Sequence, residues 1–226
     1  MDGVLLIDKP SGVTSHDVVE AARRALGLRR IGHTGTLDPM ARGLLILLVG
    51  AATSRQQELQ GHEKTYEAVI RLGTQTDTGD ATGAAISTAD VPALDPQRLE
   101  ALLVSLRGPC VQTPPAYSAI KVRGRPAYWW ARRKTPVTLA PRTVELFELT
   151  LLERGRDTIS LRVRCSAGTY IRSLAESIAG QLGTVGHLSD LVRLRVGAWR
   201  LEDAKPLAWI AQAGHDAVAG ALQPVP

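Results

Sequence analysis

A glycine-rich stretch constrains this chain more than any other, because it must form a shaped loop before an apolar segment. Residues 32–43 read Gly-His-Thr-Gly-Thr-Leu-Asp-Pro-Met-Ala-Arg-Gly, and the apolar run 44–49 follows directly. Glycine adopts backbone angles that other residues avoid, and Pro39 disfavours helical geometry at Asp38. We therefore predict that Asp38 is held in place on a stiff loop.

A carboxylate on such a loop has two interpretations. An Asp before Pro is common in turns, where its side chain accepts hydrogen bonds from nearby backbone amides, and this is the more frequent role. The alternative is a catalytic group. The loop by itself does not decide between them.

The composition is that of a globular protein with a basic surface. The 226 residues are enough to bury a substantial core, in one large domain or in a domain with inserted arms. Lys and Arg number 27 against 22 Asp and Glu, and the resulting charge of +5 favours a polyanionic partner. Two cysteines, no signal peptide and no apolar run long enough for a bilayer predict a soluble, cytoplasmic protein.

Basic residues concentrate between 121 and 142, with Tyr128, Trp129 and Trp130 in their midst. Interleaved cations and aromatic rings can contact phosphates and stack on unpaired bases. A solvated basic arm with partly buried aromatic rings explains the pattern equally well. Pro114 and Pro115 exclude helix just before this segment, which we interpret as an inserted arm.

Periodicity and capping residues predict several helices and strands. Residues 44–49 are too short an apolar run to distinguish a strand from a helix, and 73–83 read as a loop or hairpin. Helices are expected over 15–26, from the Asp95 cap to Gly108, and from 168 to 183, and strands over 66–72, 143–152 and 158–165. The irregular order predicts an α+β fold with a mixed or antiparallel sheet.

Arg172 occupies an unusual place, in the first turn of the third expected helix. The positive end of the helix dipole disfavours a cation there, so the guanidinium needs a counter-charge. One carboxylate held by an arginine fork would supply it. A solvated surface arginine is the more common explanation, and the pattern does not name a partner.

Known cofactor motifs do not occur. Residues 32–35 are not followed by the Gly-Lys-Ser/Thr of a phosphate-binding loop, the five histidines are scattered, and there is no Gly-x-Ser-x-Gly elbow. We therefore predict chemistry without a metal or another cofactor.

Six stretches, taken together in their order and spacing, resemble the TruB-type tRNA pseudouridine synthases. They are distributed across nearly the whole chain and comprise Leu-Ile-Asp-Lys-Pro-Ser-Gly (6–12), Gly-His-Thr-Gly-Thr-Leu-Asp-Pro (32–39), Lys-Thr-Tyr (64–66), Thr-Asp-Thr-Gly-Asp (76–80), Pro-Ala-Tyr-Ser-Ala-Ile-Lys (115–121) and Gly-Thr-Tyr-Ile-Arg (168–172). With this resemblance, the catalytic interpretation of Asp38 replaces the turn interpretation.

The resemblance implies a fold and a domain plan. The pseudouridine synthase fold is α+β, with a mixed, mostly antiparallel central sheet flanked by helices. We expect a single catalytic domain over 1–226, with a thumb-like, RNA-clasping arm inserted at about 115–143. Most bacterial members continue into a C-terminal PUA domain, which this sequence does not include, so we expect either a natural short form or a truncated chain.

The resemblance also implies an activity. Members convert uridine to pseudouridine at position 55, in the T loop of tRNA, without a cofactor. The target nucleotide must leave its stack before an enzyme can reach the base. We expect a monomeric isomerase whose partner is the T stem-loop of tRNA.

Three residues match the catalytic positions of the family. Asp38 corresponds to the nucleophile, which attacks either the uracil ring or the ribose. Tyr66 corresponds to a tyrosine that stacks on the flipped base, although as part of an alternating strand it is otherwise a core residue. Arg172 corresponds to the arginine that pairs with the catalytic aspartate.

Five further residues match positions around the substrate. His33 corresponds to a histidine that fills the space left by the flipped base, and Lys9 belongs to a motif packed near the site. Tyr170 supports the pocket floor, Leu191 forms an apolar wall, and Lys121 begins the basic arm. Without the resemblance, Lys9 is a surface lysine, His33 a loop histidine and Leu191 a core residue.

The sequence departs from the family pattern in the arm, where residues 128–132 (Tyr-Trp-Trp-Ala-Arg) carry a tryptophan in place of a more usual second tyrosine or leucine. Two other functions fit the same residues. One is the catalytic subunit of an RNA-guided pseudouridylase, and the other is a non-catalytic protein that binds or folds RNA.

Overall fold

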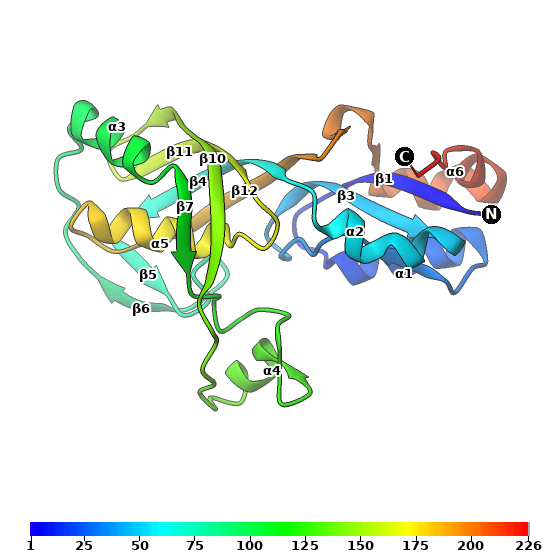
Figure 1. Ribbon diagram of the computed structural model, residues 1–226, viewed down its shortest axis with the longest axis horizontal. Helices are drawn as coiled ribbons and strands as arrows, with labels where there is room; N and C mark the ends of the chain where they lie inside the picture. The colour runs from blue at the N-terminus through cyan, green and yellow to red at the C-terminus, as the bar shows by residue number, and fades with distance from the viewer. Residues whose placement is uncertain (226) are drawn as a thin grey trace. The chain divides into compact units, whose positions relative to one another are not determined.

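The computed structural model describes residues 1–225, and the chain forms two compact units (Figure 1). The first unit comprises residues 1–67 and the described residues from 191 onward, and the second comprises residues 68–190. The chain passes between them along β4 (Lys64–Leu72) and β12 (Gly186–Val196), so each of these strands contributes to both units. Within residues 1–225, every helix is too short or too polar to cross a membrane.

The first helix of the first unit, α1 (Ser15–Leu26), has the predicted bounds. Thr14 and Asp17 form a capping box, in which the Thr14 hydroxyl accepts from the Asp17 amide at 3.1 Å and the Thr14 amide donates to the Asp17 carboxylate at 2.8 Å. Gly27 ends the helix in the left-handed conformation, with a φ of 61°. These local signals explain why the sequence alone located this helix.

The sheet of the first unit runs in the order β14-β1-β3-β12. The strands are β14 (Lys205–Pro206), β1 (Gly3–Lys9), β3 (Arg42–Val49) and β12, with β2 (Ile31–His33) paired to β3 and β13 (Trp199–Arg200) paired to β12. β3 runs antiparallel to β1 and parallel to β12, so the sheet is mixed. The ambiguous apolar run is therefore a strand, and residues 43–49 are all buried.

Helical segments surround this sheet (Figure 1). α1 packs against α6 (Leu207–Gly220) and against β2. Two short segments, η1 (Gly50–Arg55) and α2 (Gln56–Gln60), follow β3, and η2 (Leu201–Asp203) follows β13. The core beneath them includes Leu6, Ile46 and Leu48, which come from the two antiparallel strands β1 and β3.

Three residues form a row across β1, β3 and β12. Gly43 of β3 lies opposite Lys9 of β1 on one side and opposite Arg193 of β12 on the other. Gly43 has a φ of 101°, and a Cβ built on it would lie 2.5 Å from the Arg193 carbonyl oxygen. Only glycine permits so close an approach, which brings β12 against β3 at this point.

The second unit contains a sheet in the order β12-β4-β11-β10-β7. Its other elements are β5 (Thr74–Thr76), β6 (Ala85–Thr88), α3 (Pro96–Ser105), β7 (Gly108–Gln112), β10 (Arg142–Arg154), β11 (Thr158–Cys165) and α5 (Ile171–Gln181). α3 begins after Asp95, which accepts from the Arg98 amide at 2.7 Å, as predicted. Residues 73–83, predicted as a loop or a hairpin connection, contain β5 and the turn that leads to β6, with which β5 pairs antiparallel. β11 has its predicted bounds.

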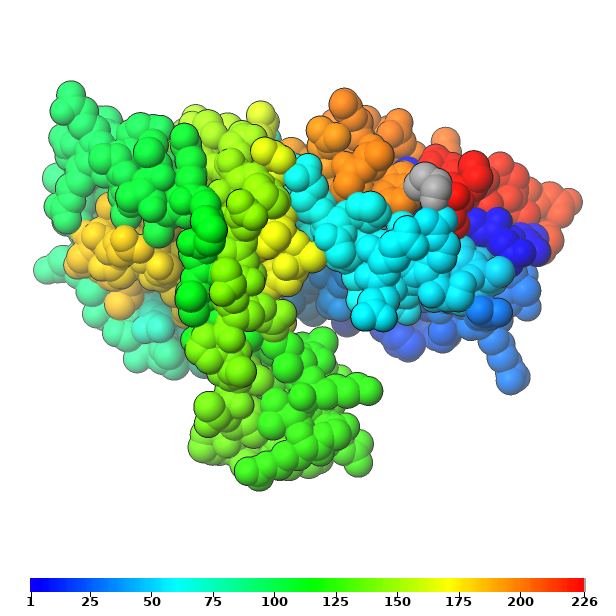
Figure 2. All heavy atoms as spheres, in the orientation of Figure 1, coloured from blue at the N-terminus to red at the C-terminus, as the bar shows by residue number. Residues whose placement is uncertain are grey.

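An arm leaves this unit between β7 and β10. It contains β8 (Lys121–Val122), β9 (Arg125–Pro126) and α4 (Ala127–Ala131). Figures 1 and 2 show it projecting from one end of β7 and β10, whereas α3 lies at the other end. The predicted α+β class with a mixed, mostly antiparallel sheet and an inserted arm is confirmed.

We predict that Gly43→Ala destabilises the first unit, because the new Cβ meets the Arg193 backbone and the positive φ strains alanine. The free energy of unfolding should fall by about 1–3 kcal/mol in urea denaturation. Gly32→Ala is the matched control, since a Cβ there meets its nearest atom at an ordinary 3.6 Å. Equal stabilities for the two variants would contradict the close approach of β12 and β3.

Candidate active site

The loop that carries Asp38 is held from several sides within the first unit. The Ser15 hydroxyl, at the start of α1, donates to the Leu37 carbonyl at 3.1 Å and accepts from the Leu37 amide at 2.9 Å. The Gly12 amide donates to the Pro39 carbonyl at 2.8 Å. These bonds bracket Asp38 on both sides, and thus explain how a segment without regular structure keeps one shape.

Asp38 itself begins a tight turn. Its carbonyl accepts from the Ala41 amide at 3.0 Å, and Pro39 occupies the second position of that turn. The turn interpretation is therefore right for the backbone. It does not exclude chemistry at the carboxylate of Asp38. This residue is half-buried, and its charge partly opposes the effect of burial on the pKa of the neighbouring Lys9.

Lys9 is fully buried at the end of β1, so the interpretation as a surface lysine is wrong. Its Nζ donates to the carbonyls of Pro10 at 2.9 Å, Val13 at 2.8 Å and Pro39 at 3.4 Å. Burial lowers the pKa of Lys9 to about 8, with Asp38 acting in the opposite direction and Arg193 in the same direction. Lys9 thereby links the motif of residues 6–12 to the loop of Asp38 by hydrogen bonds.

Arg193 is a buried cation that lies outside the six motifs. It is 1% exposed, and its Nε donates to the Leu44 carbonyl at 2.7 Å while its Nη2 donates to the Gly35 carbonyl at 3.1 Å. It is also hydrogen-bonded to the Tyr66 side chain. Val192 and Leu194 alternate with Arg193 along β12, a pattern that predicts Arg193 on the polar face, so alternation alone could not have found it.

Tyr66 and His33 complete the predicted residues that surround this loop. Tyr66 is 8% exposed on β4, and its phenol is hydrogen-bonded to Arg193. A residue that served only to pack the core would not need this polar partner. His33 ends β2, and its Nδ1 accepts from the Gly35 amide at 3.2 Å. Burial, with smaller contributions from Arg193 and His16, lowers the pKa of His33 and favours the neutral ring.

Arg172 lies in the second unit and is 4% exposed, which excludes the solvated surface arginine. Its guanidinium donates to the Thr78 carbonyl and to the Tyr117 carbonyl, each at 2.8 Å, and its Nε lies 3.9 Å from the Asp80 carboxylate. These acceptors offset the dipole at the start of α5. They also bring together three of the six motifs.

The remaining predicted residues occupy three different settings. Tyr170 is half-buried before α5, where its amide donates to the Gln112 side chain at 3.0 Å and the Arg142 guanidinium lies 5.1 Å from its ring. Leu191, on β12, is 5% exposed. Lys121 is exposed in the arm, on β8.

The aromatic rings of the arm are engaged by its own arginines. The Arg133 guanidinium lies 3.7 Å from the centre of the Trp129 ring, and that of Arg125 lies 5.5 Å from the same ring. The Trp130 indole donates to the Val122 carbonyl at 3.0 Å. The rings therefore hold guanidinium groups in place, an arrangement that favours phosphate contacts.

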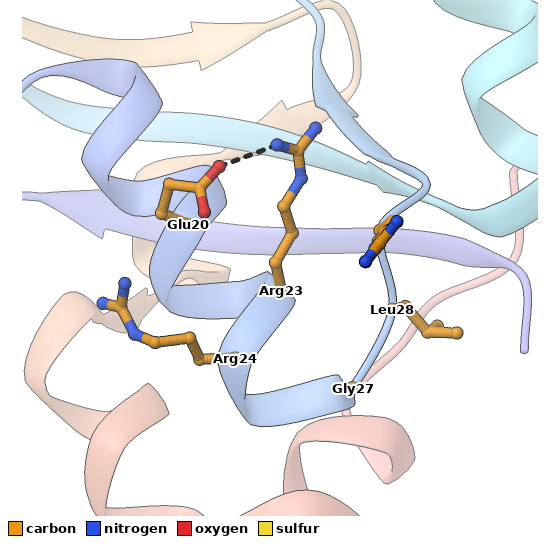
Figure 3. A pocket seen from close by; sticks show the side chains of 6 residues that line it. Glu20, Arg23, Arg24, Gly27 and Leu28 are labelled. Atoms are coloured by element: carbon orange, nitrogen blue, oxygen red, sulfur yellow. Dashed lines mark hydrogen bonds and ion pairs between the residues drawn. The ribbon is translucent and has the colours of Figure 1, made fainter.

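A separate hollow of about 420 Å³ lies at the C-terminal end of α1 (Figure 3). Arg23 points to Glu20 there and donates to it at 2.7 Å, while its other terminal nitrogen donates to the Ile31 carbonyl. Basic residues in a last turn complement the helix dipole. Within residues 1–225, no three His, Cys, Asp or Glu side chains are grouped to hold a metal ion.

The fold is that of a pseudouridine synthase, and comparisons with known proteins identify the family. Residues 23–171 match the profile of the TruB family pseudouridylate synthase (N terminal domain). The chain therefore belongs to the TruB family.

Several relatives are similar over most of the chain. The tRNA pseudouridine synthase B of Aromatoleum aromaticum is 46% identical over 225 residues, which are 100% of this chain and 73% of that protein. The protein of the same name from Opitutus terrae is 44% identical, over 92% of this chain and 86% of its own length. A chain in the crystal structure of a Cbf5-Nop10-Gar1 complex superimposes with a TM-score of 0.73 and 30% identity, covering 98% of this chain and 60% of that one.

Lys9 should give stability a distinctive pH dependence. Its pKa is about 8 in the folded chain against an ordinary 10.5, so between these values the unfolded chain binds more protons. The free energy of unfolding must then rise with pH through this window, by up to about 1.4 kcal/mol per pH unit. We predict that Lys9→Met loses this rise in denaturant titrations from pH 7.5 to 10.5.

Lys205→Met is the control for this experiment, because Lys205 is an exposed lysine of the same unit. It should keep the pH dependence of the wild type. Stability curves that run parallel for Lys9→Met and the wild type above pH 8 would contradict the lowered pKa.

Proposed function

We propose that this chain converts uridine to pseudouridine at position 55, in the T loop of tRNA. The proposal rests on how the loop of Asp38 is held. Ser15, Gly12 and the buried Lys9 donate hydrogen bonds to carbonyls of this loop and so fix the backbone around one carboxylate. Relatives 44–46% identical over nearly the whole chain are named tRNA pseudouridine synthase B, which supports the substrate.

In this proposal Asp38 is the nucleophile. Its carboxylate attacks the uracil ring or the anomeric carbon of the ribose, and the bond from that carbon to N1 of the base breaks. The base turns, C5 bonds to the anomeric carbon, and the bond between Asp38 and the substrate breaks, which restores the carboxylate. C5 loses its proton and N1 gains one, so that the atoms of the product equal those of the substrate. A covalent intermediate divides one difficult step into two easier ones.

The residues around Asp38 are assigned to the flipped nucleotide. Tyr66 stacks on the base and exchanges protons with it, Leu191 forms an apolar wall, and Tyr170 supports the floor of the pocket. His33, whose lowered pKa favours a neutral ring, fills the gap in the RNA without adding a buried charge. Extrusion of a base costs a few kcal/mol, which contacts of this kind offset.

Arg172 is proposed to pair with Asp38 during catalysis. Its guanidinium already binds two carbonyls and lies 3.9 Å from Asp80, so it is held in a fixed direction. Three of the six motifs lie in each compact unit, and the proposal therefore requires both units for one reaction.

The partner is proposed to be the T stem-loop, clasped by residues 115–143 including Lys121. The guanidinium groups of Arg125 and Arg133, held on Trp129, support this proposal because they supply positive charge for phosphate contacts. We further propose that the protein acts as a monomer in the cytoplasm.

We predict that Asp38→Asn abolishes pseudouridine formation on an unmodified T-arm stem-loop, because the amide keeps the shape but is not a nucleophile. Single-turnover rates should fall at least about a thousandfold, while the Kd of the stem-loop changes little. Asp203→Asn, which alters an exposed carboxylate of the same unit, should match the wild type. Normal turnover by Asp38→Asn would remove Asp38 from the mechanism.

One alternative has an observation in its favour. The similarity to a chain of the Cbf5-Nop10-Gar1 complex suggests the catalytic subunit of an RNA-guided pseudouridylase. Its identity of 30% is lower than the 46% of the relatives named for tRNA. The stem-loop assay separates the two, since a guided enzyme needs protein partners and guide RNA, and a non-catalytic RNA-binding protein would leave uridine unchanged.

The arm should contribute charge more than base stacking. We predict that Arg133→Gln weakens stem-loop binding and reduces the slope of log K against log salt by about 0.7 to 1, as expected for one lost phosphate contact. Arg98→Gln removes the same charge from an exposed site on α3 and should leave the slope unchanged. Identical salt dependence for both variants would contradict the role of the arm.

A further inference from the structure

We infer that Arg193 is a positioning residue for the reaction, which holds the Tyr66 phenol in a fixed relation to the loop of Asp38. This inference rests on the proposed function and extends it to a residue outside the six motifs. It is carried by the contacts of one buried guanidinium with three separate segments of the first unit.

The location of Arg193 is set by the backbone. β12 pairs with β3 at Gly43, whose missing side chain allows the Arg193 carbonyl and amide to approach within contact distance. Lys9 lies on the other side of Gly43 in the same row of the sheet. Side chains of residues directly opposite on neighbouring strands point to the same face of the sheet. The side chains of Lys9 and Arg193 therefore lie on one face, where both donate to carbonyls of the Asp38 loop.

The guanidinium then joins segments that are far apart in the sequence. It donates to the Gly35 carbonyl, at the start of the loop, and to the Leu44 carbonyl on β3, while it is hydrogen-bonded to Tyr66 on β4. The planar arginine fork fixes the directions of its donors, so these contacts set an orientation as well as a distance. Two proposed catalytic groups, on a loop and on a strand, thus share one rigid support.

Core packing alone does not account for an arginine at this position. A buried cation carries a desolvation penalty, and an apolar side chain of similar volume is often neutral or stabilising in its place. Arg193 is 1% exposed, and the charge of another buried cation, Lys9, repels it. The residue is explained by what it orients rather than by the stability it adds.

The test compares Arg193→Lys, which keeps the charge but loses the fork, with Tyr66→Phe, which removes the phenol oxygen, and with the double variant. Single-turnover rates and the Kd of the T-arm stem-loop are measured for each. Arg195→Lys, at an exposed position on the same strand, is the matched control.

We expect Arg193→Lys to slow single turnover about 10- to 100-fold with little change in Kd, because a misplaced group costs rate more than affinity. In the Tyr66→Phe background the same change should have less than about a threefold effect, since residues that act together are not additive. Arg195→Lys should match the wild type. Wild-type turnover by Arg193→Lys, or an undiminished loss in the double variant, would overturn the inference.

A second readout does not depend on activity. With the tyrosine ring carbons labelled with ¹³C, the Tyr66 resonance is identified by its absence from Tyr66→Phe. Arg193→Lys should shift that resonance and leave the exposed Tyr128 unchanged, and an unmoved Tyr66 signal would overturn the inference. If Arg193→Lys does not fold, the ¹⁵N signals of the Arg193 guanidinium give the same test, because they must move in Tyr66→Phe.

The two readouts separate this inference from the proposed function. A wild-type protein that makes no pseudouridine on the stem-loop refutes the function, and the resonance experiment still decides the contact between Arg193 and Tyr66. An active wild type with an equally active Arg193→Lys variant retains the function and refutes the positioning role.

Discussion

The close approach of β12 to β3 at Gly43 is the constraint on which the site of the first unit depends. Because Gly43 has no side chain, the backbone of Arg193 lies against it, and Lys9 and Arg193 flank it on neighbouring strands. Two cations are thereby buried beneath one loop, and backbone carbonyls are their chief acceptors. The loop keeps its shape because its carbonyls satisfy charges that cannot reach water.

Local signals in the sequence account for what could be predicted of the fold. α1 and α3 have side-chain caps, and β11 alternates strictly, so each was located from its own residues. β3 could not be assigned in advance, because a strand buried on both faces has no periodicity. β12 and α6 gave no clear pattern, since β12 mixes polar with apolar residues and α6 is kinked at Gly214, where φ is 72°.

The candidate site was predictable to the extent that its residues lie in recognisable motifs. Asp38, Tyr66 and Arg172 were selected through the family resemblance, and their catalytic roles remain predictions. The residue type of Lys9 indicated a surface position, which is wrong. A lysine at the end of a strand gives no sign in the sequence that three carbonyls surround it. Arg193 was missed for a related reason, since its partners lie more than a hundred residues away in the chain.

The stacking of Arg133 on Trp129 has a consequence for how RNA binding can be observed. The emission of an indole responds to charges beside its ring, and this indole lies 3.7 Å from a guanidinium. A phosphate that draws the guanidinium away changes the electric field at Trp129 without touching the ring. The arm therefore contains an optical reporter of bound RNA, whose emission is separated from that of Trp199 and Trp209 when those two tryptophans, which lie outside the arm, are replaced.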